Sequence, residues 1–285
     1  MTAISTGDAT QAKGGASTSL TRVAGFVTFI LPIAAFLAFW EAVVWFGLAD
    51  ATILPAPSMV LVRGWSLLNP ANSEHSLLLM HIGASLWRAL AAFVLACFVA
   101  IPLGFALGLS KGAYRALSPL LSLLLPLPAV AWTPIFLVAF GQGEITIIGV
   151  CFLGAFFPIL YSTIQGVRGI DVHSIWVVRS MGAKPMDLFR RVLLPGALPA
   201  LISGLKLGMA HSWRTLVAAE MLAALSFGLG YMIFAARSYM DVSTMFVGIV
   251  CLAVIGLLIE HAIFGTLERM TVARWHSSGK VRGAR

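Results

Sequence analysis

Charge is scarce in this sequence, and the scarcity limits what the chain can be. Only 11% of its 285 residues are Asp, Glu, Lys or Arg, whereas 59% are hydrophobic. Soluble domains carry about 25% charged residues, so the composition excludes an ordinary soluble domain and indicates a membrane protein. The net charge of +8 does not indicate nucleic-acid binding, because no basic stripe is interleaved with stacking aromatic residues.

Cysteine and the common catalytic motifs are also rare or absent. The three cysteines, Cys97, Cys151 and Cys251, lie far apart, each within an apolar run. An odd number without C-x-x-C spacing argues against a disulfide framework and a zinc site, so we expect packing residues. The sequence has no H-E-x-x-H, G-x-S-x-G or G-x-x-x-x-G-K-[ST] motif. An intramembrane enzyme is therefore disfavoured, and any ATP must be hydrolysed by another chain.

Six apolar segments are long enough to cross a bilayer as helices, which takes about 20 residues each. They span residues 23–48, 82–109, 119–140, 145–165, 201–222 and 244–267. The first is too long for the apolar core of a signal peptide, so we expect it to remain as a membrane helix. Residues 1–21 predict a disordered tail, 22–270 an all-α transmembrane domain and 271–285 a basic tail. Gly104-x3-Gly108 and Gly204-x3-Gly208 permit close helix packing.

The distribution of Lys and Arg predicts the orientation. With the amino terminus inside, fourteen of the 19 lie on inner segments and two lie within a span. Only Arg63, Arg88 and Arg237 fall on outer segments. The positive-inside rule then places both termini and the loop 168–199 in the cytoplasm.

Within this loop, residues 179–199 form a basic, amphipathic interruption between spans. Gly182 is placed to end one helix, Pro185 to open a second and Pro195 to stop it. Four cations lie close together there: Arg179, Lys184, Arg190 and Arg191. A helix–break–helix on the inner face of a membrane protein suggests a contact site for a partner outside the membrane.

The spacing in this loop resembles a known motif. Gly182, followed by nine residues and Val192-x-Leu194-Pro195, resembles the second half of the "EAA" loop of binding-protein-dependent ABC importer permeases. The first half differs, because Trp176, Val177 and Val178 replace Glu-Ala-Ala. The glutamate role of that family therefore cannot be transferred to this chain.

Further motifs extend the resemblance over residues 54–275, to the branch that imports sulfonates, taurine and nitrate. They are Leu54-Pro-x-Pro57, Ser85-Leu-x-Arg88, Pro126-Leu-Pro-x-x-Ala-Trp-x-Pro134, Phe140-Gly-x-Gly-Glu144, Leu216-Val-Ala-Ala-Glu220 and Gly228-Leu-Gly230. Each motif is weak alone, but their order along the chain makes the resemblance specific.

The resemblance implies a type I permease of about six helices in a bacterial inner (plasma) membrane, in contact with lipid. Its expected partners are two copies of a cytoplasmic ATPase, a second copy of itself and a periplasmic or lipoprotein solute-binding protein. ATP and Mg²⁺ would be used by the ATPase, and this chain would bind no cofactor or metal. The residues assigned to the coupling loop are Arg179, Gly182, Ala183, Leu188, Phe189, Val192, Leu194 and Pro195. For Leu188 and Phe189, contact with the ATPase and packing within the subunit stay equally open.

The fifth span is the most polar and is the candidate translocation path. We assign to the path His211, Ser212, Trp213, Arg214 and Glu220. Ionisable groups at membrane depth usually face a cavity or a partner. The planar fork of Arg214 suits a sulfonate, nitrate or carboxylate. The alternative for Arg214 is a pairing with a carboxylate on another helix.

A second hypothesis for the whole chain is a proton-coupled secondary transporter that uses Glu220, Glu260 and the histidines. Such transporters are usually built from matched repeats within one chain. The sequence contains no such repeat. ATP-dependent uptake that requires a separate ATPase would distinguish the two hypotheses.

Overall fold

The computed structural model describes residues 31–68 and 75–265. The predicted tails, the start of the first predicted span and the end of the sixth lie outside the described residues. All regular elements in the described part are helices. This agrees with the predicted all-α class.

The chain divides into two units, Met1–Val62 and Arg63–Arg285. The described part of the first contains the apolar helix Leu31–Trp45 and the start of α2 (Pro57–Leu68). The Glu41 carboxylate accepts hydrogen bonds from the Ser58 N–H at 3.1 Å and the Ser58 hydroxyl at 2.7 Å. A carboxylate at this position stabilises a helix start, where backbone N–H groups lack partners.

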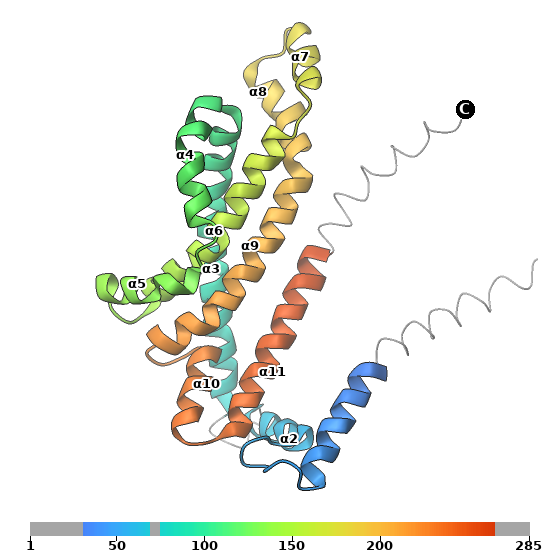
Figure 1. The fold of residues 1–285 in the computed structure, drawn as a ribbon, viewed down its shortest axis with the longest axis vertical. Coiled ribbons are helices and arrows are strands. Elements are labelled where there is room, and N and C mark those ends of the chain that lie inside the picture. The colour runs from blue at the N-terminus through green and yellow to red at the C-terminus, as the bar shows by residue number, and fades with distance from the viewer. Residues whose placement is uncertain (1–30, 69–74, 266–285) are drawn as a thin grey trace, which may run out of the picture. The chain divides into compact units, whose positions relative to one another are not determined.

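The second unit holds the remaining elements. They are α3 (His75–Leu109), α4 (Lys111–Leu124), η1 (Ala129–Trp132), α5 (Thr133–Phe140), α6 (Glu144–Arg168), α7 (Val172–Ser180), α8 (Pro185–Leu188), η2 (Phe189–Leu193), α9 (Leu194–Ala223), α10 (Leu229–Ser238), α11 (Val242–Leu258) and η3 (Ile259–Phe264). In Figure 1, α7 and α8 lie at one end of the long helices and α10 at the other. We call the α7–α8 segment, residues 172–188, the coupling tip.

Four described helices are long and apolar enough to cross a membrane: Leu78–Leu109, Glu144–Arg168, Pro185–Ala223 and Val242–His261. They correspond to the second, fourth, fifth and sixth predicted spans. The third predicted span is broken, because α4 meets the η1–α5 segment at an angle of 88°. Prolines at 126 and 128 explain the break, since proline cannot donate a backbone hydrogen bond. The count of six spans stays a prediction.

The helices α3, α6 and α9 pack side by side and form the core (Figure 1). Small residues at their contacts let the backbones approach closely. A Cβ added to Gly104 would lie 2.6 Å from Thr163, and one added to Gly204 would lie 2.5 Å from Ser162. The prediction of close packing at these glycines is confirmed.

One predicted helix end is wrong. The sequence predicts that Pro195 stops the second helix of the loop, but the chain is helical from Pro185 to Ala223. The π-helical segment η2 explains this, because the Leu194 N–H reaches the Phe189 carbonyl, five residues back. Pro195 then falls in the first turn of α9, where a missing N–H is tolerated.

Candidate functional site

A cavity of about 640 Å³ lies between the break of the third span and the helices α6 and α9. Its walls are largely apolar, including residues 125–130 of the break and Phe157 of α6. Its polar lining side chains are Tyr161, Ser162, His211, Arg214 and Thr215. Among the described residues that line it, arginine occurs and carboxylates do not, so the cavity is suited to a negatively charged solute.

Arg214 lies within α9, closer to the end of this helix than to its start. It precedes the end of α9 at Ala223 by nine residues, which corresponds to roughly 14 Å along a helix. The hydrocarbon layer of a bilayer is about 30 Å thick. Both Arg214 and His211 are exposed in the described chain. Both line the cavity, and their assignment to a path stays a prediction. Among the described residues, no carboxylate pairs with Arg214.

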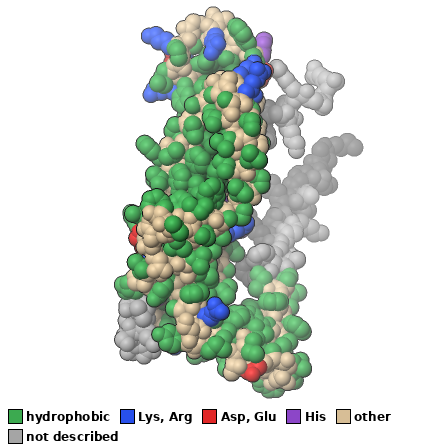
Figure 2. Space-filling model, turned by 60° about the vertical axis from the view of Figure 1, so that its left-hand side comes forward, with side chains coloured by type: hydrophobic (Ala, Val, Ile, Leu, Met, Phe, Trp, Pro, Cys, Tyr) green, Lys and Arg blue, Asp and Glu red, His purple; other side chains and the backbone are tan. Residues whose placement is uncertain are grey.

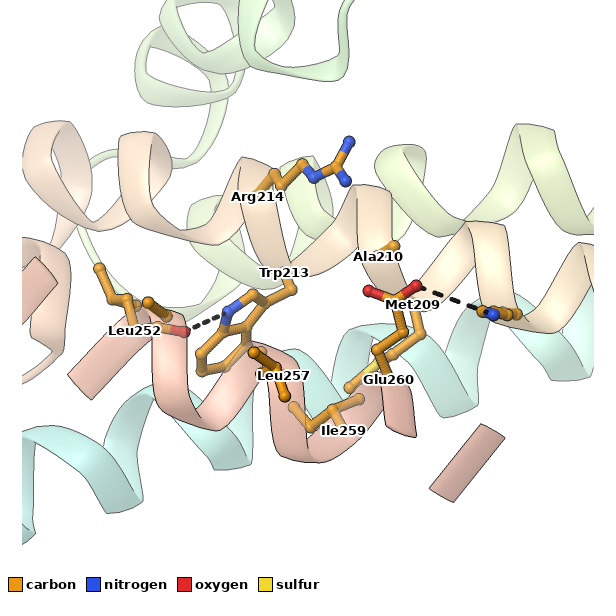
Figure 3. Close-up of a pocket in the computed structure, with 11 residues that line it drawn as sticks. Met209, Ala210, Trp213, Arg214, Leu252, Leu257, Ile259 and Glu260 are labelled. Carbon is orange, nitrogen blue, oxygen red and sulfur yellow. Dashed lines mark hydrogen bonds and ion pairs between the residues drawn. The ribbon is translucent and has the colours of Figure 1, made fainter. Parts of the chain in front are cut away.

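Ser212 and Trp213 are not placed as predicted. Ser212 is fully buried against α6, and its hydroxyl has no hydrogen-bond partner among the described residues. Trp213 points toward α11 and donates its indole N–H to the Leu252 carbonyl at 3.2 Å (Figure 3). The helical turn explains both positions, because consecutive residues face different sides of α9.

Trp213 belongs instead to a second, smaller cavity of about 200 Å³ between α9 and α11. Figure 3 shows that Arg214, which borders this cavity too, points away from Trp213. At the rim, the Lys206 ammonium lies 3.8 Å from the Glu260 carboxylate. Glu260 therefore pairs with a lysine of α9, which weakens its assignment to a proton relay.

Glu220 is also misplaced by the path prediction. It is fully buried at the end of α9, where its carboxylate accepts a hydrogen bond from the Arg88 guanidinium at 2.9 Å and others from the Ser85 hydroxyl. Arg88 bonds in turn to Glu144, Nε to Oε2 at 2.9 Å. We call Ser85, Arg88, Glu144 and Glu220 the outer cluster. The charges compensate one another, which is how ionisable groups persist in a buried position.

The outer cluster corrects the assignment of Arg88 to an outer segment. Arg88 lies inside the span Leu78–Leu109, and its side chain is only 5% exposed. Its carboxylate partners explain how a span tolerates it. The number of Lys and Arg residues on the predicted outer segments then falls from three to two. The excess of cations on the inner segments becomes larger, so the positive-inside rule still supports the predicted orientation. The sequence motifs named these residues, but nothing in their spacing revealed that they meet.

The coupling tip begins as predicted. Gly182 follows the end of α7 with φ of +76°, a conformation that favours glycine, and its N–H bonds to the Arg179 carbonyl at 3.0 Å. Pro185 opens α8. Figure 2 shows Lys and Arg side chains gathered at this end of the second unit. The tip therefore presents a basic surface.

The structure decides the orientation of Leu188 and Phe189. Leu188 is buried, and the Phe189 ring packs edge-to-face on Phe105 of α3 at 5.2 Å. Both side chains thus pack within the subunit, which is the second of the two alternatives given for them.

The remaining residues of the predicted coupling loop differ in exposure. Val192 packs in the same apolar cluster as Leu188, whereas Leu194 is 36% exposed. Ala183 and Pro195 are half-buried, and Arg179 and Gly182 are exposed. The exposed members lie where a partner can reach them.

The apolar residues that the tip exposes were not predicted from the sequence. Trp176, Met181 and Met186 are 65%, 81% and 60% exposed. The opposite face of α7, with Ile175 and Val178, packs inward. A signal existed in the sequence, because α7 has more apolar residues than one buried face requires.

The described residues hold no group of three or more metal-ligating side chains.

Comparison with known proteins identifies the class. Residues 100–265 match the family described as binding-protein-dependent transport system inner membrane component. The chain belongs to this family, so it is a multi-pass inner-membrane permease of a binding-protein-dependent transport system.

Three relatives show the branch within the family. The chain is 34% identical to the taurine transport system permease protein TauC of Escherichia coli, over 86% of this chain and 88% of the relative. It is 32% identical to the putative aliphatic sulfonates transport permease protein SsuC of Bacillus subtilis, over 89% of each. It is 32% identical to the nitrate import permease protein NrtB of Synechocystis, over 84% and 87%. The predicted sulfonate, taurine and nitrate branch is confirmed.

The fold is also found among solved structures. A chain from inward-facing crystals of the MetNI methionine ABC transporter aligns with a TM-score of 0.61 at 21% identity. The alignment covers 69% of this chain and 97% of that one. It supports the type I permease fold.

Proposed function

We propose that this chain forms the substrate path for a small anion, such as an alkanesulfonate, taurine or nitrate. The observation that carries the proposal is the cavity of about 640 Å³, whose described lining contains Arg214 and no carboxylate. The named substrates of the relatives carry a sulfonate group or are nitrate, and both present oxyanion faces that a guanidinium can bind by paired hydrogen bonds.

The energy for transport comes from a partner in this proposal. Two copies of a cytoplasmic ATPase bind ATP and Mg²⁺, and this chain binds no cofactor itself. The absence of a Walker A motif supports the division of labour. A second copy of the chain completes the assembly as a two-fold dimer, and a solute-binding protein delivers the anion from outside.

Coupling takes place at the tip. The exposed apolar side chains of Trp176, Met181 and Met186 enter the ATPase, and the cations around them contact its acidic rim. Trp176 stands where the related loop has glutamate, so contact here is apolar. ATP-driven closure of the two ATPases then moves the tips together and turns the path from inward-open to outward-open.

The path is tested by uptake into vesicles that contain the permease with its ATPase and binding protein. Arg214→Ala should lower uptake of taurine, methanesulfonate or nitrate by about a hundredfold, since it removes a charge-assisted pair of hydrogen bonds worth roughly 3 kcal/mol. Arg214→Lys keeps the charge without the fork and should retain part of the activity. Normal uptake by Arg214→Ala would refute the role of the cavity.

The structure argues against the proton-coupled alternative. Glu220 and Glu260, its two carboxylates, are paired with Arg88 and Lys206. Neither carboxylate lines the cavity of about 640 Å³, where a relay coupled to the solute would need one. Uptake driven by ATP and insensitive to a protonophore would exclude this alternative.

A further inference from the structure

The first turn of α10 is held by side chains of other helices. Three consecutive backbone N–H groups donate to α3 and α9: Gly228 to His81 at 3.0 Å, Leu229 to Ser85 at 2.8 Å and Gly230 to Glu220 at 2.9 Å. The first N–H groups of a helix lack internal partners and carry partial positive charge, so a carboxylate there is stabilising. This turn is therefore anchored to two membrane spans.

Arg88 connects this turn to a second one. Its Nη1 donates both to Glu220 and to the Phe227 carbonyl in the turn between α9 and α10. Its Nε and Nη2 donate to Glu144, the first residue of α6. The Gly143 N–H also bonds to the Ala223 carbonyl, at 2.9 Å. One guanidinium thus joins α3 to the start of α6, the end of α9 and the turn that leads into α10.

The backbone is shaped to fit this ion pair. Gly228 has φ of +141°, and an added Cβ would lie 2.6 Å from Glu220 and 2.7 Å from Arg88. Only a residue without a side chain permits so close an approach. Four of the separate sequence motifs meet at this point, those of Ser85 and Arg88, of Glu144, of Glu220 and of Gly228.

The members of the outer cluster differ in exposure. The side chains of Arg88 and Glu220 are 5% and 0% exposed, whereas that of Glu144 is 55% exposed. The buried pair can keep its geometry while Glu144 is reached from solvent. The cluster lies at the end of the spans opposite the coupling tip, well separated from the proposed contact with the ATPase (Figure 1).

We propose that Arg88 and Glu220 are positioning residues for transport, which hold α3, the start of α6, the end of α9 and the start of α10 as one block. The joined helices move as a unit when the inner side closes. Binding of the loaded solute-binding protein at the outer side therefore changes the position of the coupling tip. This inference rests on the proposed function. Neither residue lines the cavity described above.

The test uses the reconstituted complex of permease, ATPase and solute-binding protein in lipid vesicles. Glu220→Gln keeps the side-chain volume, and Arg88→Lys keeps a cation without the fork. Both should lower taurine uptake and the stimulation of ATP hydrolysis by loaded binding protein by about tenfold, the size of a typical coupling between distant sites. Basal ATP hydrolysis should stay unchanged, because the tip is intact. Arg237→Gln, which removes an exposed cation of α10 outside the cluster, is the matched control and should behave as the wild type.

The double variant Arg88→Gln with Glu220→Gln is a control for loss of activity through misfolding. It removes both members of the buried ion pair, so no unpaired charge is left buried. We expect it to assemble with the ATPase, hydrolyse ATP at the basal rate and fail to respond to the binding protein. A wild-type response in the double variant would overturn the proposal, and so would a loss of basal hydrolysis equal to the loss of uptake. If the wild type itself shows no ATP-dependent uptake of any tested anion, the proposed function fails instead.

Discussion

The two ends of the second unit are held together by different forces. The outer cluster joins four helices through one buried ion pair, one half-exposed ion pair and backbone hydrogen bonds, with Arg88 at its centre. The coupling tip is held by apolar packing of Leu188 on one face, while its other face exposes Trp176 and Met181. One end is thus built to keep its geometry, and the other retains apolar surface for a partner.

The largest expected effect comes from removing the centre of the outer cluster. Arg88→Ala leaves the carboxylate of Glu220 buried without its cation, and breaking a buried pair in this way costs about 3–5 kcal/mol. We expect a marked fall in the unfolding midpoint of the purified permease in detergent. Arg237→Ala, at an exposed position, should change stability by no more than about 0.5 kcal/mol. Equal midpoints for the two variants would show that the buried ion pair does not stabilise this end of the unit.

A smaller effect is expected from the backbone next to the same ion pair. Gly228→Ala introduces a Cβ where φ is +141° and Glu220 would lie 2.6 Å away. Strained backbone of this kind costs about 1–3 kcal/mol. The matched control is Gly83→Ala in α3, where an added Cβ meets no atom within 4 Å and the helix gains stability. The melting temperatures of the two variants should move in opposite directions, and a shared direction would contradict the strain at Gly228.

At the coupling tip, a substitution should change activity and leave stability alone. Trp176→Glu restores the carboxylate of the related loops, but it places a charge where we propose an apolar contact. Its unfolding midpoint should stay within about 0.5 kcal/mol of the wild type, since the side chain is 65% exposed. ATP-driven uptake should fall about tenfold, since contact residues of this kind contribute more than about 1 kcal/mol. Trp176→Phe should retain uptake, and full activity of Trp176→Glu would mean that the partner accepts a carboxylate.

The smallest effect concerns an exposed ion pair near the outer end. Burial opposes the charged form of Asp241, but hydrogen bonds from Thr244 and the nearby Arg63 outweigh it, so its pKa lies below the ordinary 3.8. A lowered pKa stabilises the fold above the ordinary value, and this stabilisation is lost as the pH falls through the pKa of the folded state. Because the pair is partly exposed, it contributes at most about 1 kcal/mol. Melting temperatures of wild type and Asp241→Asn should differ at about pH 6 and converge as the pH falls below the ordinary pKa of 3.8; a constant difference would exclude this origin.

Much of the fold can be predicted from the sequence by simple rules. Hydropathy located four of the spans that the structure describes, and small residues at 104 and 204 indicated where helices pack closely. The prolines of the third span indicate a break in the helix, but they do not predict its angle of 88°. The predicted helix end at Pro195 is wrong. A π-helical turn lies directly before Pro195, and the helix continues through a residue that usually interrupts one.

The functional regions were harder to predict, for a physical reason. A polar span shows which residues exist at membrane depth, but the side to which each points depends on the packing of its neighbours. Arg214 and His211 border the cavity, whereas Trp213 bonds to α11 and Glu220 to Arg88. The outer cluster joins residues up to 135 positions apart in sequence, and no local pattern encodes such pairing.

Under the proposed function, the continuous helix from Pro185 to Ala223 is the mechanical link between the two regions. Its 39 residues extend over roughly 58 Å, so a push on the tip reaches Arg214 and Glu220 through one rod and not through a series of loops. The π-helical segment Phe189–Leu193 sets the twist of this rod. Adding or removing one residue in a helix rotates the two flanking parts relative to each other by about 100°. The coupling tip and the proposed anion path therefore share one rotational setting, and a single deletion in this segment would turn the tip away from the ATPase that we propose it contacts.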